Sequence, residues 1–88
     1  MVSKDFTITN KMGLHMRPAQ VLVGEMNKFS STVNIRFGGK DINAKGIMGL
    51  MAACIKCGAQ ITVECDGADE QAALDAASAL IESGFGEE

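Results

Sequence analysis

Four short runs of alternating apolar and polar residues restrict the fold of this chain more than any other feature. The runs cover residues 6–9, 33–37, 40–44 and 59–66. A period of two is typical of strands that bury one face and expose the other, and sheets with one polar face are usually antiparallel. Gly38 and Gly39 separate the second run from the third. Because glycine accepts the positive φ of a tight turn, this pair predicts a β-hairpin.

Three other segments have the apolar spacing of helices. The first opens with Pro18, and apolar residues recur every three or four positions up to Met26. The second covers residues 47–53 and is apolar on nearly every side. The third follows Asp69, a good N-cap, and stops at Gly84, which suits a helix end. The resulting order, β-α-β-β-α-β-α, predicts a two-layer α+β fold with three helices on one face of a four-stranded antiparallel sheet.

Length and charge exclude several classes of protein. Eighty-eight residues make a single domain, residues 1–88. The net charge of −3 and the absence of Trp and Tyr predict no nucleic-acid partner, since binding one needs a basic face or aromatic stacking. The longest nearly apolar run, residues 47–55, is far shorter than the roughly 18 residues of a membrane helix. With no signal peptide in view, we expect a cytoplasmic protein that does not insert into membranes.

Three cysteines leave several interpretations open. Cys54 and Cys57 form a C-x-x-C motif, and Cys65 lies in the last alternating run. The motif fits a redox pair, and together with Cys65 and His15 it supplies the four ligands of a zinc site. However, it follows the end of a predicted helix, where the helix dipole disfavours thiolates. We therefore expect small core-packing residues, and the sequence predicts no metal and no cofactor.

The single histidine, His15, lies where the first strand gives way to the first helix. The amide N–H groups of a first helical turn, with the positive end of the helix dipole, attract a phosphate placed there. Arg17 adds a guanidinium that fits phosphoryl oxygens. The same dipole disfavours an imidazolium, so we expect a neutral, nucleophilic imidazole. A solvated loop residue or a capping donor is the structural alternative for His15.

The segment Gly13-Leu14-His15-Met16-Arg17-Pro18 resembles the active-site motif of HPr, the phosphocarrier family of the bacterial sugar phosphotransferase system. The resemblance extends over the whole chain. It includes the hairpin at Gly38-Gly39-Lys40 and the segments at residues 45–51, 58–62 and 67–70, all similar to HPr of the Gram-positive type. The family fold that it implies is an open-faced β-sandwich, in agreement with the predicted order of strands and helices.

This resemblance implies a function. His15 would accept a phosphoryl group through Nδ1 from the phosphohistidine of enzyme I and pass it to the A domain of a sugar-specific enzyme II. Arg17, with Met16 and Pro18 beside it, would position the phosphoryl oxygens. Met16 departs from the small residue or Thr that the family usually has there, and we expect it to tune partner affinity. Such a protein is a carrier rather than an enzyme, needs no bound metal or cofactor, and is expected to be a monomer.

A surface for these partners is predicted beside His15. Residues 47–53 carry no charge, and one helix of a small domain cannot bury all seven. Exposed apolar patches often mark interfaces, and Met adapts to several partner surfaces. The resemblance indicates five partner contacts: Gln20, Val21, Ile47, Met48 and Met51. The alternative, which spacing alone favours, is that the stripe in residues 47–53 belongs to the core.

Gly46 is a second departure from the family. HPr proteins of the Gram-positive type have a serine at this position, which an ATP-dependent kinase phosphorylates as a regulatory signal. Glycine has no hydroxyl, so the sequence predicts the loss of this branch, although glycine is also simply tolerated at a helix start. Two functional alternatives stay open. One is a purely regulatory relative, against which His15 and the missing serine argue, and the other is a carrier for a nitrogen-linked phosphotransferase branch.

Overall fold

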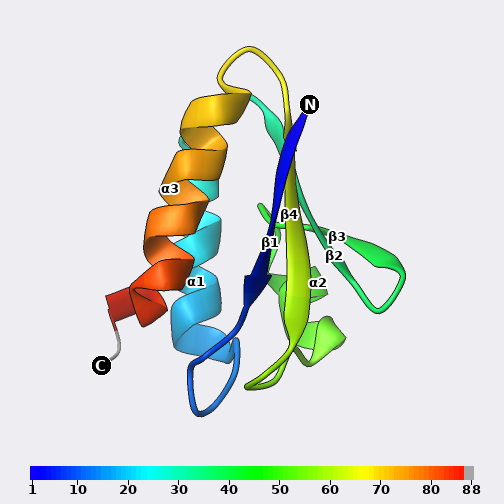
Figure 1. Cartoon of the computed structure of the whole chain (residues 1–88), viewed down its shortest axis with the longest axis vertical. Helices are drawn as coiled ribbons and strands as arrows, with labels where there is room; N and C mark the ends of the chain where they lie inside the picture. The colour runs from blue at the N-terminus through cyan, green and yellow to red at the C-terminus, as the bar shows by residue number, and fades with distance from the viewer. Residues whose placement is uncertain (87–88) are drawn as a thin grey trace.

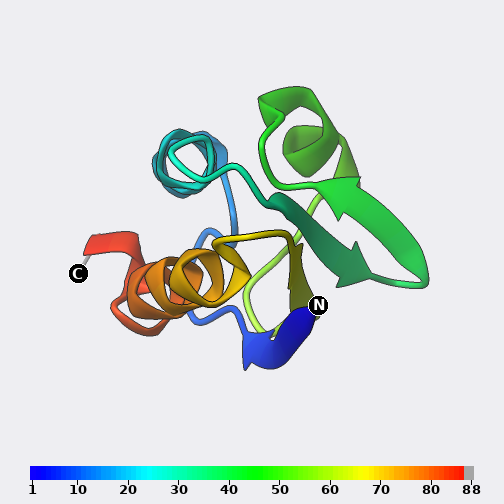
Figure 2. The same cartoon turned by 90° about the horizontal axis from the view of Figure 1, so that it is seen from above.

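A four-stranded antiparallel sheet carries three α-helices on one face (Figure 1). The computed structural model describes residues 1–86. The strands are β1 (Val2–Thr7), β2 (Thr32–Phe37), β3 (Lys40–Asn43) and β4 (Gln60–Asp66), in the spatial order β1-β4-β2-β3. The helices are α1 (Met16–Met26), α2 (Ile47–Ala53) and α3 (Glu70–Glu82), followed by a 3₁₀ turn, η1 (Gly84–Gly86). Figure 2 shows all three helices on the same side of the sheet, which confirms the predicted open-faced fold.

The alternating runs became the strands because each places its apolar residues under the helices. In the central strand β4, Ile61, Val63 and Cys65 are buried, the residues between them are half-buried, and the two end residues are exposed. The antiparallel register sets Ile35 of β2 opposite Val63. It also sets Phe6 of β1 opposite Ile61. The buried residues of neighbouring strands therefore meet on one face, and this face forms the floor of the core.

The first strand differs from its predicted bounds. The alternation indicated residues 6–9, whereas β1 covers Val2–Thr7 and pairs with β4 from Val2 opposite Cys65 to Thr7 opposite Gln60. The exposed residues before Phe6 hid the earlier start, because their polar side chains resemble a loop. Past the strand, the N–H of Ile8 still donates to the carbonyl of Ala59 at 2.9 Å. The chain therefore stays fixed beside β4 as it leaves the sheet.

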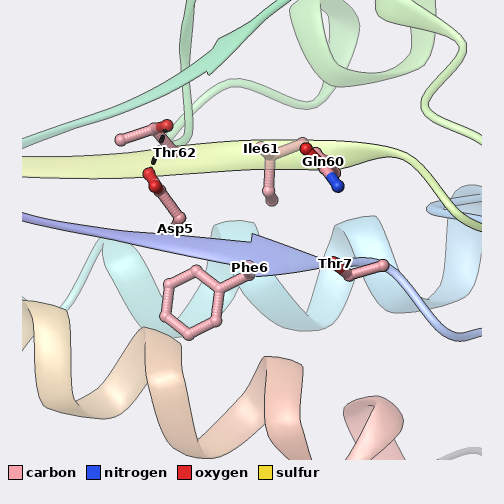
Figure 3. Close-up of a pocket in the computed structure, with 6 residues that line it drawn as sticks. All are labelled: Asp5, Phe6, Thr7, Gln60, Ile61 and Thr62. Atoms are coloured by element: carbon pink, nitrogen blue, oxygen red, sulfur yellow. Dashed lines mark hydrogen bonds between the residues drawn. The ribbon is translucent and has the colours of Figure 1, made fainter.

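The sheet face opposite the helices is polar. Across β1 and β4, the hydroxyl of Thr62 donates to Asp5 Oδ1 at 2.7 Å, while Phe6 points away from this pair toward the helices (Figure 3). Further along, Arg36 Nε donates to Asp41 Oδ1 at 3.1 Å. A depression of about 430 Å³ lies over residues 5–7 and 60–62, and none of the predicted site residues lines it. This face therefore offers no support for the site predicted at His15.

The apolar run after the hairpin folds as α2 and the turn that follows it. Leu50 is fully buried, and Ile55 beyond the helix is buried as well. Within residues 1–86, the structure contains no helix whose length and apolar character would let it cross a membrane. The run is therefore part of the core and of the surface that borders it.

Asp69 precedes α3 as predicted, but its side chain does not cap that helix. Its carboxylate accepts N–H bonds from Ser30 and Ser31, each at 2.9 Å, and a short hydrogen bond from the Ser31 hydroxyl. The hydrogen bond from the Ser31 hydroxyl is the largest cause that lowers the pKa of Asp69 from 3.8 to about 2, and the amide of Ser30 adds to it. Asp69 therefore ties the start of α3 to the loop between α1 and β2.

The lowered pKa of Asp69 predicts a loss of stability in acid. Because the folded-state value lies below the unfolded-state value, the carboxylate stabilises the fold fully above about pH 4, and this contribution fades as the pH falls towards about 2. Asp69→Asn should lower the urea midpoint at pH 7 and flatten the further decline between pH 4 and pH 2. The matched control is Asp75→Asn, which removes the same charge from α3 without touching the α1–β2 loop. Equal slopes of stability against pH in the native chain and in Asp69→Asn would contradict this assignment.

Candidate functional site

His15 is the N-cap of α1, so the predicted place of the histidine at a helix start is confirmed. Its backbone is extended, with φ −78° and ψ −169°, and its carbonyl accepts the N–H of Ala19 at 3.0 Å. The helix begins at Met16, two residues before Pro18, because this bond already encloses Met16, Arg17 and Pro18 in the first turn. The His15 side chain makes no capping hydrogen bond, which removes the capping donor as an explanation for this residue.

The start of α1 has the donors of an anion site. The amides of Met16 and Arg17 have no acceptor within the helix, since they precede the first intrahelical bond. Pro18 has no N–H at all, and its ring is buried. His15 is half-buried, whereas the side chains of Met16 and Arg17 are exposed. A phosphoryl group on the imidazole would therefore meet two backbone N–H groups, the helix dipole and a solvent-facing guanidinium.

The loop between β1 and α1 is hydrogen-bonded to the segment after α2 and packs closely against it. Leu14 donates its N–H to the carbonyl of Ile55 at 2.8 Å, and its side chain is buried. Gly13 adopts φ +68°, and a Cβ at this position would lie 2.5 Å from the Ile55 carbonyl oxygen. The glycine before the histidine therefore lets two stretches of backbone touch. Neither Ile55 nor its neighbour Lys56 carried a signal in the sequence that linked it to the site.

The five residues predicted to contact partners differ in how far they are exposed. Of the residues on α2, Met48 has 81% of its surface exposed, whereas Ile47 and Met51 are half-buried and pack against the core. On α1, Gln20 and Val21 are exposed. The core alternative therefore applies in part to Ile47 and Met51, and Met48 points fully outward.

Helices α1 and α2 are neighbours on the same side of the sheet (Figure 2), and the hydrogen bonds at their ends show that they run in opposite directions. At one end, Asn27 just past α1 donates through Nδ2 to the carbonyl of Lys45, just before α2, at 3.1 Å. At the other end, the bond between Leu14 and Ile55 joins the start of α1 to the residues after α2. The exposed residues of the two helices can therefore contribute to one surface that includes the start of α1.

The structure corrects the expectation for two of the three cysteines. Cys65 is buried in β4, and burial raises the pKa of its thiol, as expected of a core residue. Cys54 and Cys57, however, are exposed free thiols. Helix α2 ends at Ala53, and Cys54 is its C-cap, in a left-handed conformation with φ 53°. Within residues 1–86, no three or more His, Cys, Asp or Glu side chains gather in a group that could hold a metal ion.

The family model "PTS HPr component phosphorylation site" matches residues 2–83. The phosphocarrier protein HPr of Cupriavidus necator is 44% identical over 87 residues, which cover 99% of this chain and 98% of the relative. The HPr-like protein Crh of Halalkalibacterium halodurans is 46% identical over 82 residues, covering 93% and 98%. Both matches cover more than nine tenths of this chain.

Solved structures agree in fold. The crystal structure of HPr-C-His from Thermoanaerobacter tengcongensis has a TM-score of 0.96 and 42% identity, and the match covers 100% of this chain and 99% of that one. A second structure from the same organism is an HPr dimer, with a TM-score of 0.80, 41% identity and coverage of 99% and 100%. A family model over most of the chain, and identities above 40% over nearly its full length, place the chain in one family. The chain belongs to the HPr family of phosphocarriers of the phosphotransferase system.

Proposed function

We propose that this chain carries a phosphoryl group on His15, taken from phospho-enzyme I and delivered to the A domain of an enzyme II. The observation that carries the proposal is the place of His15 at the start of α1, in a chain that matches the HPr family model over residues 2–83. In the first transfer, a P–N bond on enzyme I breaks as a P–N bond to Nδ1 of His15 forms. The second transfer repeats this exchange with the enzyme II domain as acceptor.

The residues around His15 supply positioning and charge, which is most of what phosphoryl transfer requires. The amides of Met16 and Arg17 face an anion at the start of the helix, and the Arg17 guanidinium can pair with two phosphoryl oxygens. Pro18 fixes the backbone of the first turn from within the core. The chain acts as a carrier and not as an enzyme, because it is itself the phosphoryl acceptor in the first transfer and the phosphoryl donor in the second.

The exposed residues of α1 and α2 form the proposed partner surface, with Met48 at its most exposed point. Gln20, Val21, Ile47 and Met51 complete it. A carrier must release each partner quickly, so we propose small and transient interfaces, formed by a monomer in the cytoplasm. The HPr of Thermoanaerobacter tengcongensis has also been solved as a dimer. Sedimentation of the free chain would therefore test whether it is a monomer.

Charging by enzyme I tests the proposed function. The purified chain is incubated with enzyme I and phosphoenolpyruvate, and its native mass is measured before and after brief acid treatment. We expect one added phosphoryl group that acid removes, because the P–N bond is labile in acid. An authentic HPr serves as the positive control. If that control is charged and this chain is not, the carrier function is wrong for this enzyme I.

Regulation by a seryl kinase should be absent at position 46. Gly46 is the N-cap of α2 and has no hydroxyl to accept a phosphoryl group from ATP. Ser30 and Ser31 are poor substitutes, since both lie outside the segment at residues 45–51 and Ser31 is also buried against Asp69. Incubation with HPr kinase and ATP should therefore leave the mass unchanged, whereas Gly46→Ser should gain an acid-stable phosphate. An acid-stable phosphoserine on the native chain would contradict this expectation.

A further inference from the structure

Asn10 lies in the loop that leads to His15, and two of its hydrogen bonds bear on the position of that loop. The residue is buried, with only 6% of its surface exposed, and Nδ2 donates to the carbonyl oxygen of Gly84 at 2.8 Å. Its backbone carbonyl accepts the N–H of Gly13 at 2.8 Å. One residue therefore joins the His15 loop to the end of α3, 74 positions away in the sequence.

The acceptor of this bond is itself held in place. Gly84 and Phe85 of η1 both adopt left-handed backbone conformations, with φ 66° and 58°, and both are buried. The Phe85 ring packs into the core with only 7% of its surface exposed. A positive φ is costly for a non-glycine residue, and it persists where the surrounding packing enforces it. The carbonyl that receives Asn10 is therefore a fixed point.

The loop between β1 and α1 then has anchors on two sides. The bond from Leu14 to Ile55 attaches it to the segment after α2. The bond from Asn10 to Gly84 attaches it to η1 beyond α3. With Asn10 removed, the second anchor disappears, and the Gly84 carbonyl loses a buried donor, which is costly in free energy.

We propose that Asn10 is a positioning residue for His15, acting through the loop that it ties to η1. The inference rests on the proposed carrier function, because it assigns Asn10 to the same site. Phosphoryl transfer depends on alignment of the donor, the phosphorus and the acceptor nitrogen. A misplacement of about 1 Å by a change away from the chemistry can cost on the order of 100-fold in rate.

The test compares Asn10→Ala and Asn10→Leu with Ser31→Ala. Asn10→Leu nearly keeps the size of the side chain and removes the N–H donor without burying a charge against the Gly84 carbonyl oxygen, so it serves even if Asn10→Ala does not fold. Ser31 is the other buried polar residue among residues 1–86. It lies in the loop that follows α1, and its hydroxyl donates a hydrogen bond to Asp69. Ser31→Ala therefore removes a buried hydrogen bond beyond the opposite end of α1 from His15, which makes it the matched control.

Two quantities are measured on the full chain: the charging rate by phospho-enzyme I and the exchange of the Gly13 and Leu14 amides. Both Asn10 variants should charge about 10-fold to 100-fold more slowly, mainly through kcat, since the exposed partner surface is unchanged. Their Gly13 and Leu14 amides should lose protection from hydrogen exchange. Ser31→Ala should unfold at lower urea yet charge at the native rate with the same two amides protected.

Two further results decide the proposal. Phe85→Ala should slow charging too, and combined with Asn10→Ala it should add little, because both changes release the same anchor. Native charging rates in the Asn10 variants, or an equal loss in Ser31→Ala, would overturn the positioning role. If the native chain is not charged at all, the carrier function fails, and the amide exchange still shows whether Asn10 fixes the loop.

Discussion

Charging by phospho-enzyme I should disappear completely when His15 is replaced by Ala. His15 is the single histidine of the chain, so no other imidazole can take over as acceptor. The fold should survive, because the side chain is half-buried and makes no capping hydrogen bond to α1. Native mass after incubation with enzyme I and phosphoenolpyruvate gives the result directly, and a urea titration of the same sample shows that the variant is folded.

The control for this experiment lies in the same loop. Thr9→Ala changes an exposed side chain six positions before the histidine and leaves the start of α1 intact. It should charge at the native rate. An acid-labile phosphate on folded His15→Ala would show that another residue is the acceptor, and the assignment of His15 would then be wrong.

Gly13→Ala should damage both the stability of the chain and its charging. The added Cβ would lie 2.5 Å from the Ile55 carbonyl oxygen and 2.7 Å from Lys56 Cα, at a φ of +68°. These are backbone atoms, which cannot rotate away, so the loop before His15 must move. We expect a loss of about 1–3 kcal/mol in the free energy of unfolding from backbone strain. The displaced imidazole should also lower the charging rate by roughly 10-fold to 100-fold.

Substitutions at two other glycines separate the cost of the positive φ from the cost of the close contact with Ile55. Gly24 lies inside α1, and a Cβ added there would have no neighbouring atom within 4 Å, so Gly24→Ala should stabilise the chain by about 0.5–1 kcal/mol. Gly58 adopts φ +88° in open space, so Gly58→Ala imposes the strained conformation without the contact. If Gly13→Ala behaves like Gly58→Ala in both urea titration and charging, the close approach to Ile55 has no role of its own.

The sheet and the helices could be predicted from the sequence, because their signals are local. The alternation at residues 59–66 has a period of two, and burial of one face selects the strand that shows it. The place of His15 at a helix start was also visible, since Pro18 marks a first turn. The start of β1 was missed because its outer residues are polar. The hydrogen bonds of the Asp69 side chain were not predicted, because its partners Ser30 and Ser31 are distant in the sequence.

The strand and helix pattern, and the position of His15 and Arg17 at a helix start, could be read from the residue order alone. Both follow from spacing between neighbouring residues, which the chain displays directly. The surroundings of His15 became visible only in the packed fold, where the Ile55 carbonyl lies against Gly13 and Asn10 is hydrogen-bonded to Gly84. The packed fold also leaves Cys54 and Cys57 exposed. These features depend on which distant backbone groups meet when the helices pack on the sheet, and no local pattern of residue types encodes such meetings.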